Sequence, residues 1–323
     1  MRFRDDPLPR FVGLSRHGMR VLITGGAGFI GSHLAQALVE HGAEVHVLDD
    51  LSSGHLENLD GLDVQMHVGS VLDHDVLALV TRGVDYTLHH AARPALAESI
   101  HDPHRSFAVN VQGTLNVLEA ARQARVKRVI YAASSSAYGE PKVIPTPEGV
   151  LLQPVTPYAA FKLQGELLCQ SWYRTFGLET VCLRYFNIFG ERQDPKNPYA
   201  AVIPLFVEAF RRGMAPMIFG DGLVSRDFTP VANVVAANLA ALTAPGVAGK
   251  VYNIGTGTGT TLIGLVQVLN HIFGMAIEPV HAPARHGDVR ASRADIRRAT
   301  LNLGYIPAVD LAEGLRKMVA WEG

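Results

Sequence analysis

Short apolar runs alternate with longer amphipathic stretches from Met19 onward, a pattern typical of a parallel sheet whose strands are joined by helices. The apolar runs predict strands at residues 20–24, 44–49, 64–68, 86–90, 128–133 and 180–186. Stretches with helical spacing lie between them, at residues 29–41, 74–82, 105–125 and 157–176. The pattern therefore predicts an α/β fold built on a doubly wound parallel sheet.

The alternation loosens after Asn187, where Gly and Pro become frequent in the segment GERQDPKNPY. This change predicts a smaller α/β lobe over residues 187–323, with parts near 226–254 returning to the first domain. Its expected elements are helices near 200–212, 261–273 and 309–320 and strands at 217–219 and 251–254. Residues 1–18 are expected to form a loosely held tail and residues 19–186 the sheet domain. The expected site is the cleft between the two parts, at the carboxyl ends of the strands.

The composition is that of a globular protein, with 48% hydrophobic and 18% charged residues. The 29 Lys and Arg against 30 Asp and Glu give a net charge of −1, which offers no attraction to nucleic acid or to an anionic membrane. No apolar run is long enough for a signal peptide or a membrane span. Cys169 and Cys182 are expected to be buried free thiols, so we expect a cytoplasmic protein. The His residues form no metal-binding array, and no metal site is expected.

A glycine-rich segment, GGAGFIG at residues 25–31, joins the first predicted strand to the first predicted helix. Glycines there let backbone amides approach a pyrophosphate, and the helix N-terminus adds its positive end. Asp49 ends the second strand, 18 residues after Gly31. A carboxylate at this place can bind the adenosine ribose and would repel a 2′-phosphate, so the pattern favours NAD over NADP.

A second glycine segment, NIGTGTG at residues 253–259, also follows a predicted strand and precedes a predicted helix. It lies in the looser half of the chain, without the succession of strands that builds a dinucleotide fold. We therefore expect a flexible connection there rather than a ligand site.

A candidate proton-handling group begins the helix predicted at 157–176. Tyr158 and Lys162 are four residues apart, so they project from one helix face. An ammonium beside a phenol is expected to lower the pKa of the phenol toward working pH, which would make Tyr158 a general base. Ser134 lies at the carboxyl end of a predicted strand and could hydrogen-bond the same substrate hydroxyl.

With these motifs the chain resembles the extended short-chain dehydrogenase/reductase family, and within it the UDP-sugar 4-epimerases, especially those acting on UDP-N-acetylglucosamine (UDP-GlcNAc). The resemblance covers nearly the whole chain after the tail and rests on the segments GGAGFIG, LDDLSSG, HHAA, NVQGT, AASSSAYG, PYAAFK, RYFNIFGERQDP, YAAVIP, SRDF and RHGDVRASRAD. It implies a Rossmann domain that binds NAD, a lobe that binds the nucleotide sugar, and a homodimer formed through the helices near 105–125 and 157–176.

The same resemblance implies which residues touch the ligands. The catalytic residues would be Tyr158, Lys162 and Ser134. Contacts to NAD would come from Gly25, Gly28, Phe29, Ile30, Gly31, Asp49, Asp50, Ser53, Gly54, Ser70, Val71, His90, Ala91, Ala92, Asn110, Tyr158, Lys162 and Tyr185. Contacts to the UDP-sugar would come from Ser134, Ser135, Ser136, Tyr158, Asn187, Ala201, Val202, Phe219, Arg226, Arg285, Asp288 and Ser292, with the two Arg on phosphate.

Four departures and correspondences refine this expectation. Related dehydratases and decarboxylases carry an acid in the stretch after Ser134, which has no carboxyl group here, so elimination is disfavoured. Ser70 replaces an adenine-binding Asp, which could weaken NAD binding, and Phe161 replaces a Ser or Thr before the Lys. Ser292 corresponds to a position where a large aromatic residue would exclude an N-acetyl group, and equally suits an exposed loop.

The expected reaction is inversion at carbon 4 of a UDP-hexose, UDP-GlcNAc and UDP-glucose included, by oxidation to a 4-keto sugar and hydride return. Two alternatives stay open. One is a UDP-glucuronate 4-epimerase or another NAD-linked enzyme on the same scaffold. The other is a regulatory protein that binds NAD without chemistry.

Overall fold

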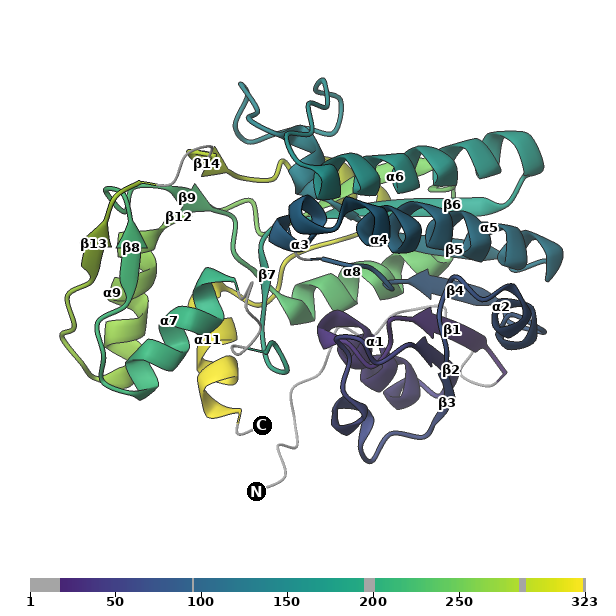
Figure 1. The fold of residues 1–323 in the computed structure, drawn as a ribbon, viewed down its shortest axis with the longest axis horizontal. Helices are drawn as coiled ribbons and strands as arrows, with labels where there is room; N and C mark the ends of the chain where they lie inside the picture. The colour runs from purple at the N-terminus through teal and green to yellow at the C-terminus, as the bar shows by residue number, and fades with distance from the viewer. Residues whose placement is uncertain (1–17, 95, 195–200, 285–288, 322–323) are drawn as a thin grey trace.

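A seven-stranded parallel sheet lies at the centre of the larger domain in the computed structural model, which describes residues 18–94, 96–194, 201–284 and 289–321. Its strand order is β11-β6-β5-β4-β1-β2-β3 (Figure 1). The strands are β1 (Arg20–Thr24), β2 (Glu44–Asp49), β3 (Val64–Val68), β4 (Tyr86–His89), β5 (Arg128–Ser134), β6 (Glu179–Tyr185) and β11 (Lys250–Ile254). The chain direction across the sheet reverses between β1 and β4, so a crevice opens at the carboxyl ends of these two strands. The predicted doubly wound sheet is confirmed.

Helices cover both faces of this sheet (Figure 1). The helices α1 (Phe29–Glu40), α8 (Val231–Thr243) and α10 (Arg297–Leu303) pack on one face, and α2 (His74–Val80), α5 (Gly113–Gln123) and α6 (Pro157–Phe176) pack on the other. Alternate residues of β1 enter the two cores: Val21 and Ile23 face α1 and α8, whereas Leu22 faces the opposite layer. A strand that is buried on both faces has a continuous run of apolar residues, which is why β1 could be predicted from the sequence.

The predicted helix at 157–176 has the observed bounds of α6 because its ends carry local signals. Thr156 accepts a hydrogen bond from the N–H of Ala159 at 3.2 Å, and Pro157 occupies the first helical position. Gly177 ends the helix with a positive φ of 73°.

The predicted helix at 105–125 is instead three pieces: α4 (Pro103–Phe107), a π-helical turn at Ala108–Gln112, and α5. The turn brings Asn110 against the backbone of Arg93, where it bonds both the N–H and the carbonyl. A short helix, α3 (Leu96–His101), precedes α4 and was not predicted. Six residues are too few to show a helical period.

Helix α8 was also missed. Nine of its 13 residues are buried, so the mostly apolar segment VANVVAANLAALT shows no continuous polar face that would reveal a helical period. The helix packs against the sheet, and β11 pairs with β6 at the sheet edge, so this part of the chain returns from the second half to the main sheet.

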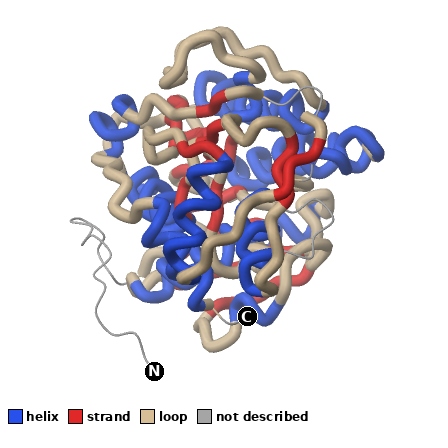
Figure 2. Tube along the Cα trace, turned by 90° about the vertical axis from the view of Figure 1, so that its left-hand side faces the viewer, coloured by secondary structure: helices blue, strands red, loops and turns tan. Residues whose placement is uncertain are grey.

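The smaller lobe has its own apolar core, made by α7 (Val202–Arg211), α9 (Leu262–Phe273) and α11 (Leu311–Ala320). Figure 2 views the molecule from the side of this lobe. Its strands are short: β8 (Met217–Phe219) pairs with β13 (Val280–Ala282), β9 (Ser225–Arg226) with β12 (Thr260–Thr261) and β14 (Ala291–Ser292), and β7 (Ile188–Phe189) with β10 (Thr229–Pro230). Most of these two- and three-residue strands were not predicted, since they are too short to show an alternation.

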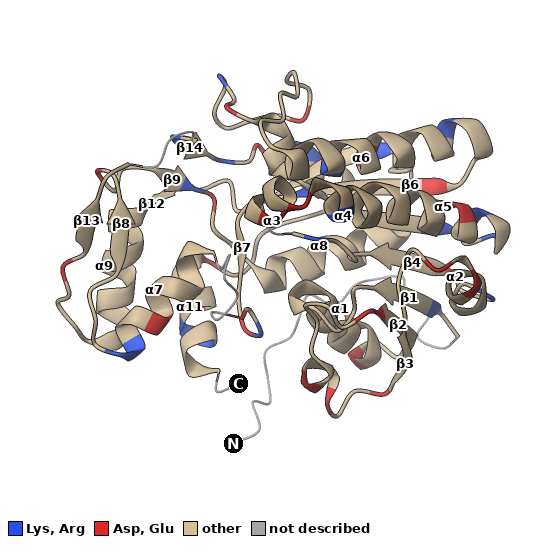
Figure 3. Ribbon diagram, in the orientation of Figure 1, with Lys and Arg blue, Asp and Glu red and all other residues tan. Residues whose placement is uncertain are grey.

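Charged residues of both signs are interspersed along the ribbon of both lobes in Figure 3. Among the described helices, none combines the length and the apolar character that crossing a membrane would need.

Candidate active site

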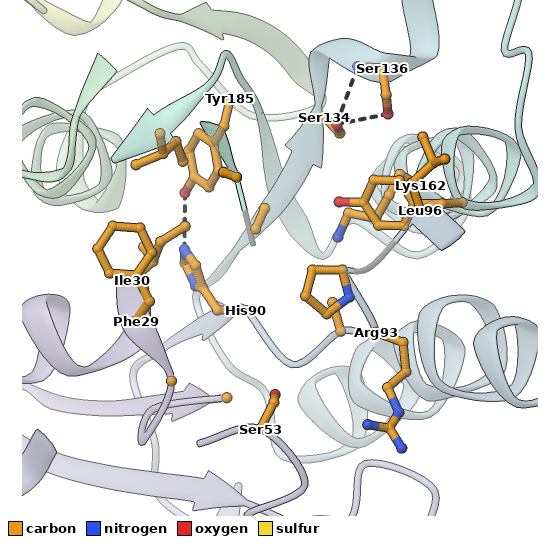
Figure 4. Close-up of a pocket in the computed structure, with 18 of the residues that line it drawn as sticks. Phe29, Ile30, Ser53, His90, Arg93, Leu96, Ser134, Ser136, Lys162 and Tyr185 are labelled. Atoms are coloured by element: carbon orange, nitrogen blue, oxygen red, sulfur yellow. Dashed lines mark hydrogen bonds between the residues drawn. The ribbon is translucent and has the colours of Figure 1, made fainter. Parts of the chain in front are cut away.

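A cavity of about 1230 Å³ lies in the crevice and draws its walls from both lobes. The large domain supplies the glycine loop after β1 and the ends of β2, β4, β5 and β6. The smaller lobe supplies Val202, Arg226 and Ser292, among others. Figure 4 shows Phe29, His90, Tyr185, Ser134 and Lys162 around one shared space. The volume is large enough for two ligands side by side.

The glycine loop requires glycine on steric grounds. Gly25 has a φ of 72°, and a Cβ there would lie 2.6 Å from the backbone N of Ala91. A Cβ on Gly31 would lie 2.1 Å from the carbonyl oxygen of Gly25. The loop leads into α1, whose N-cap Gly28 provides no side-chain cap and leaves the first N–H groups of the helix available. This cradle fits the pyrophosphate of a dinucleotide.

Asp49 ties this loop to the end of β2. Its carboxylate accepts hydrogen bonds from the N–H groups of Ala27 and Leu51, both at 2.9 Å. Burial raises the pKa of Asp49, and these hydrogen bonds act against the rise. Gly54 packs against the same carboxylate, because a Cβ there would come within 2.9 Å of both oxygens. Gly54 therefore supports Asp49 and is not among the described residues that line the cavity.

A hydrogen-bonded polar pair, His90 and Tyr185, forms part of the cavity wall. His90 Nε2 lies 2.9 Å from the hydroxyl of Tyr185, which is in turn hydrogen-bonded to Asn238 (Figure 4). Burial lowers the pKa of His90 to about 3, so the imidazole is neutral at physiological pH.

Tyr158, Lys162 and Ser134 line the same part of the cavity. The hydroxyls of Ser134 and Ser136 are 2.8 Å apart. Burial raises the pKa of Tyr158, and its hydrogen bond with Ser134 lowers it. This corrects the expectation that Lys162 would lower the pKa of Tyr158: the Lys162 ammonium lies instead over the ring of Tyr131, 4.5 Å from its centroid.

Lys162 is 4% exposed, and burial lowers its pKa to about 8. An unfolded chain keeps this Lys protonated up to about pH 10.4. Between these two pH values the unfolded state binds more protons than the folded state, so the free energy of unfolding should rise with pH. The rise should be up to about 1.4 kcal/mol per pH unit larger in the wild type than in Lys162→Met, which has no group that titrates at this position. Urea denaturation of both proteins between pH 8 and 10 measures this difference. A constant difference over that range would contradict it.

Asp227 organises the side of the cavity formed by the smaller lobe. This fully buried carboxylate accepts hydrogen bonds from the N–H and hydroxyl of Thr256 and from the N–H groups of Gly257 and Ala294, at 2.7–3.0 Å. The segment 253–259, expected to be a flexible connection, is thus fixed around a buried acid, and it does not line the cavity.

The neighbouring strands place two expected sugar-nucleotide contacts on the cavity wall. Arg226 of β9 and Ser292 of β14 are in register, and both line the cavity. The Nη1 of Arg226 donates to the carbonyl of Val289 at 2.6 Å, which fixes the position of the guanidinium.

Most of the expected contacts come together on the cavity wall. Those that line it are Gly25, Gly28, Phe29, Ile30, Gly31, Asp49, Asp50, Ser53, Ser70, Val71, His90, Ala91, Ala92, Ser134, Ser135, Ser136, Tyr158, Lys162, Tyr185, Asn187, Ala201, Val202, Arg226 and Ser292. Besides Gly54, two expected contacts do not line it. Asn110 is behind the wall, bonded to Arg93, and Phe219 is in β8, in register with Ala282. Arg285 and Asp288 lie outside the described residues.

Several lining residues were missed by the sequence analysis. Arg93 and Leu96 follow β4, and Arg192 and Gln193 follow β7. The rule that ligands bind at the carboxyl ends of parallel strands could have found Arg93, which comes four residues after His89. Phe161 does not line the cavity and packs edge-on against Phe107, with ring centroids 5.5 Å apart.

Comparison with known proteins now assigns the family. The sequence profile of the NAD dependent epimerase/dehydratase family matches residues 21–255. A UDP-glucose 4-epimerase from Thermotoga maritima, solved with UDP-glucose, is 41% identical, with a TM-score of 0.89 over 93% of this chain and 97% of that one. A UDP-N-acetylglucosamine 4-epimerase from Methanobrevibacter ruminantium, in complex with UDP-N-acetylmuramic acid, is 36% identical, with a TM-score of 0.90 over 94% and 97%.

A third solved structure broadens the range of substrates among these relatives. The UDP-glucuronic acid 4-epimerase from Bacillus cereus, in complex with UDP-glucuronic acid and NAD, is 30% identical, with a TM-score of 0.86 over 93% of this chain and 98% of that one. The family resemblance seen in the sequence is confirmed. The chain belongs to the NAD dependent epimerase/dehydratase family.

Proposed function

We propose that this protein inverts carbon 4 of a UDP-hexose with NAD as its cofactor. One observation carries the proposal: Tyr158, Ser134 and Lys162 line the same cavity as the glycine loop, so a proton-accepting group and a dinucleotide cradle share one space. A hydrogen on carbon 4 has no adjacent carbonyl and is not acidic. Inversion at that carbon therefore requires oxidation to a ketone before reduction from the opposite face.

Tyr158, Ser134 and Lys162 have different roles in this proposed reaction. Tyr158 takes the proton of the 4-hydroxyl, and Ser134 holds that hydroxyl and the phenol together. Lys162, fixed over Tyr131, places a positive charge on the cavity wall where the cofactor would lie. Bound NAD supplies the redox chemistry by accepting and returning hydride at carbon 4.

The UDP part of the substrate stays anchored while the sugar turns over. Asn187 and Arg226 are on the cavity wall at the smaller lobe, where a guanidinium suits a diphosphate. Contacts of Arg285 and Asp288 with the same group remain predictions from the family resemblance.

For the sugar, we propose that the pocket accepts UDP-GlcNAc as well as UDP-glucose, because Ser292 is small. We expect Ser292→Tyr to lower kcat/KM for UDP-GlcNAc at least about tenfold while changing that for UDP-glucose less than about threefold. The matched control is Ser292→Ala, which keeps the space and should keep both activities. Equal losses on the two substrates for Ser292→Tyr would argue against a role in selecting the 2-substituent.

Proton NMR of the purified protein with UDP-GlcNAc, UDP-glucose and UDP-glucuronate, supplied separately, tests the activity itself. A new galacto-configured anomeric signal from either of the first two supports the proposal. Conversion of UDP-glucuronate alone would indicate the glucuronate enzyme, and accumulation of NADH would indicate a net oxidoreductase. Binding of NAD with no conversion of any substrate would favour a regulatory protein.

We infer further that the protein forms a homodimer through α5 and α6, as the resemblance implies. Leu167 and Phe176 of α6 are 54% and 51% exposed, so two large apolar side chains of this helix are left uncovered in the single chain. Analytical ultracentrifugation measures the oligomeric state, and a monomer at micromolar concentration would count against this inference.

A further inference from the structure

The first turn of α6 is capped from two places in the chain. The N–H groups of the first four positions, here Thr156 to Ala159, have no i→i−4 partner, and Pro157 has no N–H at all. The N–H of Ala159 donates to the hydroxyl of Thr156 at 3.2 Å, whereas the N–H of Ala160 already makes the first ordinary helical bond, to the carbonyl of Thr156 at 3.0 Å. The N–H of Tyr158 donates to the hydroxyl oxygen of Ser99 at 3.1 Å.

Ser99 is built for this bond. It is fully buried in α3, and its own proton goes to the carbonyl of Leu96 at 2.6 Å. A hydroxyl has one proton and two lone pairs, so engaging the proton with Leu96 leaves an oxygen lone pair for Tyr158. The two bonded residues are 59 apart in sequence, so the contact is made by the fold and not by a local capping motif.

The helix that carries Ser99 is itself held in place. Arg93, just before α3, has its N–H and carbonyl bonded to Asn110, and its guanidinium pairs with Glu98 at 3.4 Å. Leu96 and Ile100 of α3 line the cavity, as Lys162 does. The hydroxyl of Ser99 therefore connects α3, which lines the cavity, to Tyr158, the proposed base.

We propose that Ser99 is a positioning residue, which holds the first turn of α6 so that the phenol of Tyr158 stays in hydrogen-bonding reach of Ser134. The inference rests on the proposed role of Tyr158. Only a small displacement of Tyr158 can be tolerated, because its phenol must hydrogen-bond both the Ser134 hydroxyl and the substrate hydroxyl. A misplacement of about 1 Å can cost up to about 10²-fold in rate.

The test compares Ser99→Ala with Asp102→Ala. Asp102 caps the neighbouring helix α4 through the N–H of Arg105 at 3.0 Å and does not line the cavity. We expect Ser99→Ala to lower kcat about tenfold with KM changed less than about twofold. We also expect the ascending limb of its pH–kcat profile to move up by about half a unit, because Tyr158 loses a hydrogen bond that lowers its pKa. Asp102→Ala should change neither quantity.

A second variant, Ser99→Cys, keeps the side-chain connectivity with a slightly larger atom that is a weak acceptor, and kcat should fall between those of wild type and Ser99→Ala. Ser99→Cys replaces Ser99→Ala in the test if Ser99→Ala does not fold. The proposal would be overturned if Ser99→Ala had the same kcat, and the same ascending limb of the pH–kcat profile, as Asp102→Ala. The same result for Ser99→Cys would overturn it if Ser99→Ala does not fold. Ser99 would then be an ordinary helix cap.

A measurement without substrate separates this proposal from the proposed function. The absorbance of tyrosinate near 295 nm is titrated in wild type and in Tyr158→Phe, and the difference reports Tyr158 alone. The same comparison is then made between Ser99→Ala and the double variant Ser99→Ala/Tyr158→Phe. The pKa of Tyr158 from this second difference should be higher than that from the first. An unshifted titration refutes the positioning role even if the enzyme epimerises UDP-sugars. A shifted titration in a protein with no such activity supports the positioning role and refutes the proposed function instead.

Discussion

Replacing Tyr158 by Phe should lower kcat on the preferred UDP-hexose by about 10²-fold or more, with NAD still bound. General acid–base catalysis contributes typically about 10²–10⁴-fold, and the substitution removes only the hydroxyl that takes the proton. The ring remains to fill its part of the cavity wall. Steady-state kinetics measures the loss, and the cofactor released on denaturation measures NAD occupancy.

The matched control is Tyr173→Phe on the same helix. Tyr173 is 38% exposed and does not line the cavity, so this variant should keep wild-type kinetics. If Tyr158→Phe turns over at the wild-type rate, another group is the base. If it loses NAD as well, the defect lies in binding and not in proton transfer.

Replacing Glu166 by Gln should lower the free energy of unfolding by about 3 kcal/mol or more. Glu166 and Arg184 are 2% and 3% exposed and form a bidentate pair, with bonds of 2.6 and 2.8 Å between α6 and β6. Removing one charge leaves the Arg184 guanidinium buried without its counter-ion, which costs about 3–5 kcal/mol in comparable pairs. Urea denaturation at pH 7 measures the change.

The effect should also reach beyond the pair, because Arg184 donates to the hydroxyl of Tyr138 at 2.8 Å and to the carbonyl of Glu148. Tyr138 in turn donates to Asn253, which bonds the carbonyl of Thr146. The control is Glu208→Gln, which breaks an exposed i,i+4 pair with Arg212 and should cost less than about 0.5 kcal/mol. Similar losses in the two variants would show that the buried pair does not stabilise the fold as argued.

The main sheet and its cofactor loop could be predicted from local sequence. Strands buried on both faces, such as β1, are continuous apolar runs, and α6 begins and ends at residues with clear capping signals. The glycine loop is recognisable because its close backbone contacts admit no Cβ. Tyr158 and Lys162 are predictable as a pair because four residues make one helical turn.

Contacts between distant segments could not be predicted in this way. The sequence suggests that Lys162 lowers the pKa of Tyr158, whereas burial raises it and the ammonium lies over Tyr131. Asn110 and Gly54 belong to motifs typical of the family, yet the fold places them behind the cavity wall. A residue type and its spacing do not reveal the direction in which a side chain points once the elements have packed.

The sequence by itself determined the strands β1 to β6, the helices α1 and α6, the phosphate-binding loop and the candidate base, because each depends on neighbours within a few residues. Only the tertiary structure decided that Asp227 fixes the second glycine segment and that Ser99 caps the helix of Tyr158. These arrangements join residues that are far apart in the chain. Their stability comes from burial and hydrogen bonds that exist only after packing, so no local pattern encodes them.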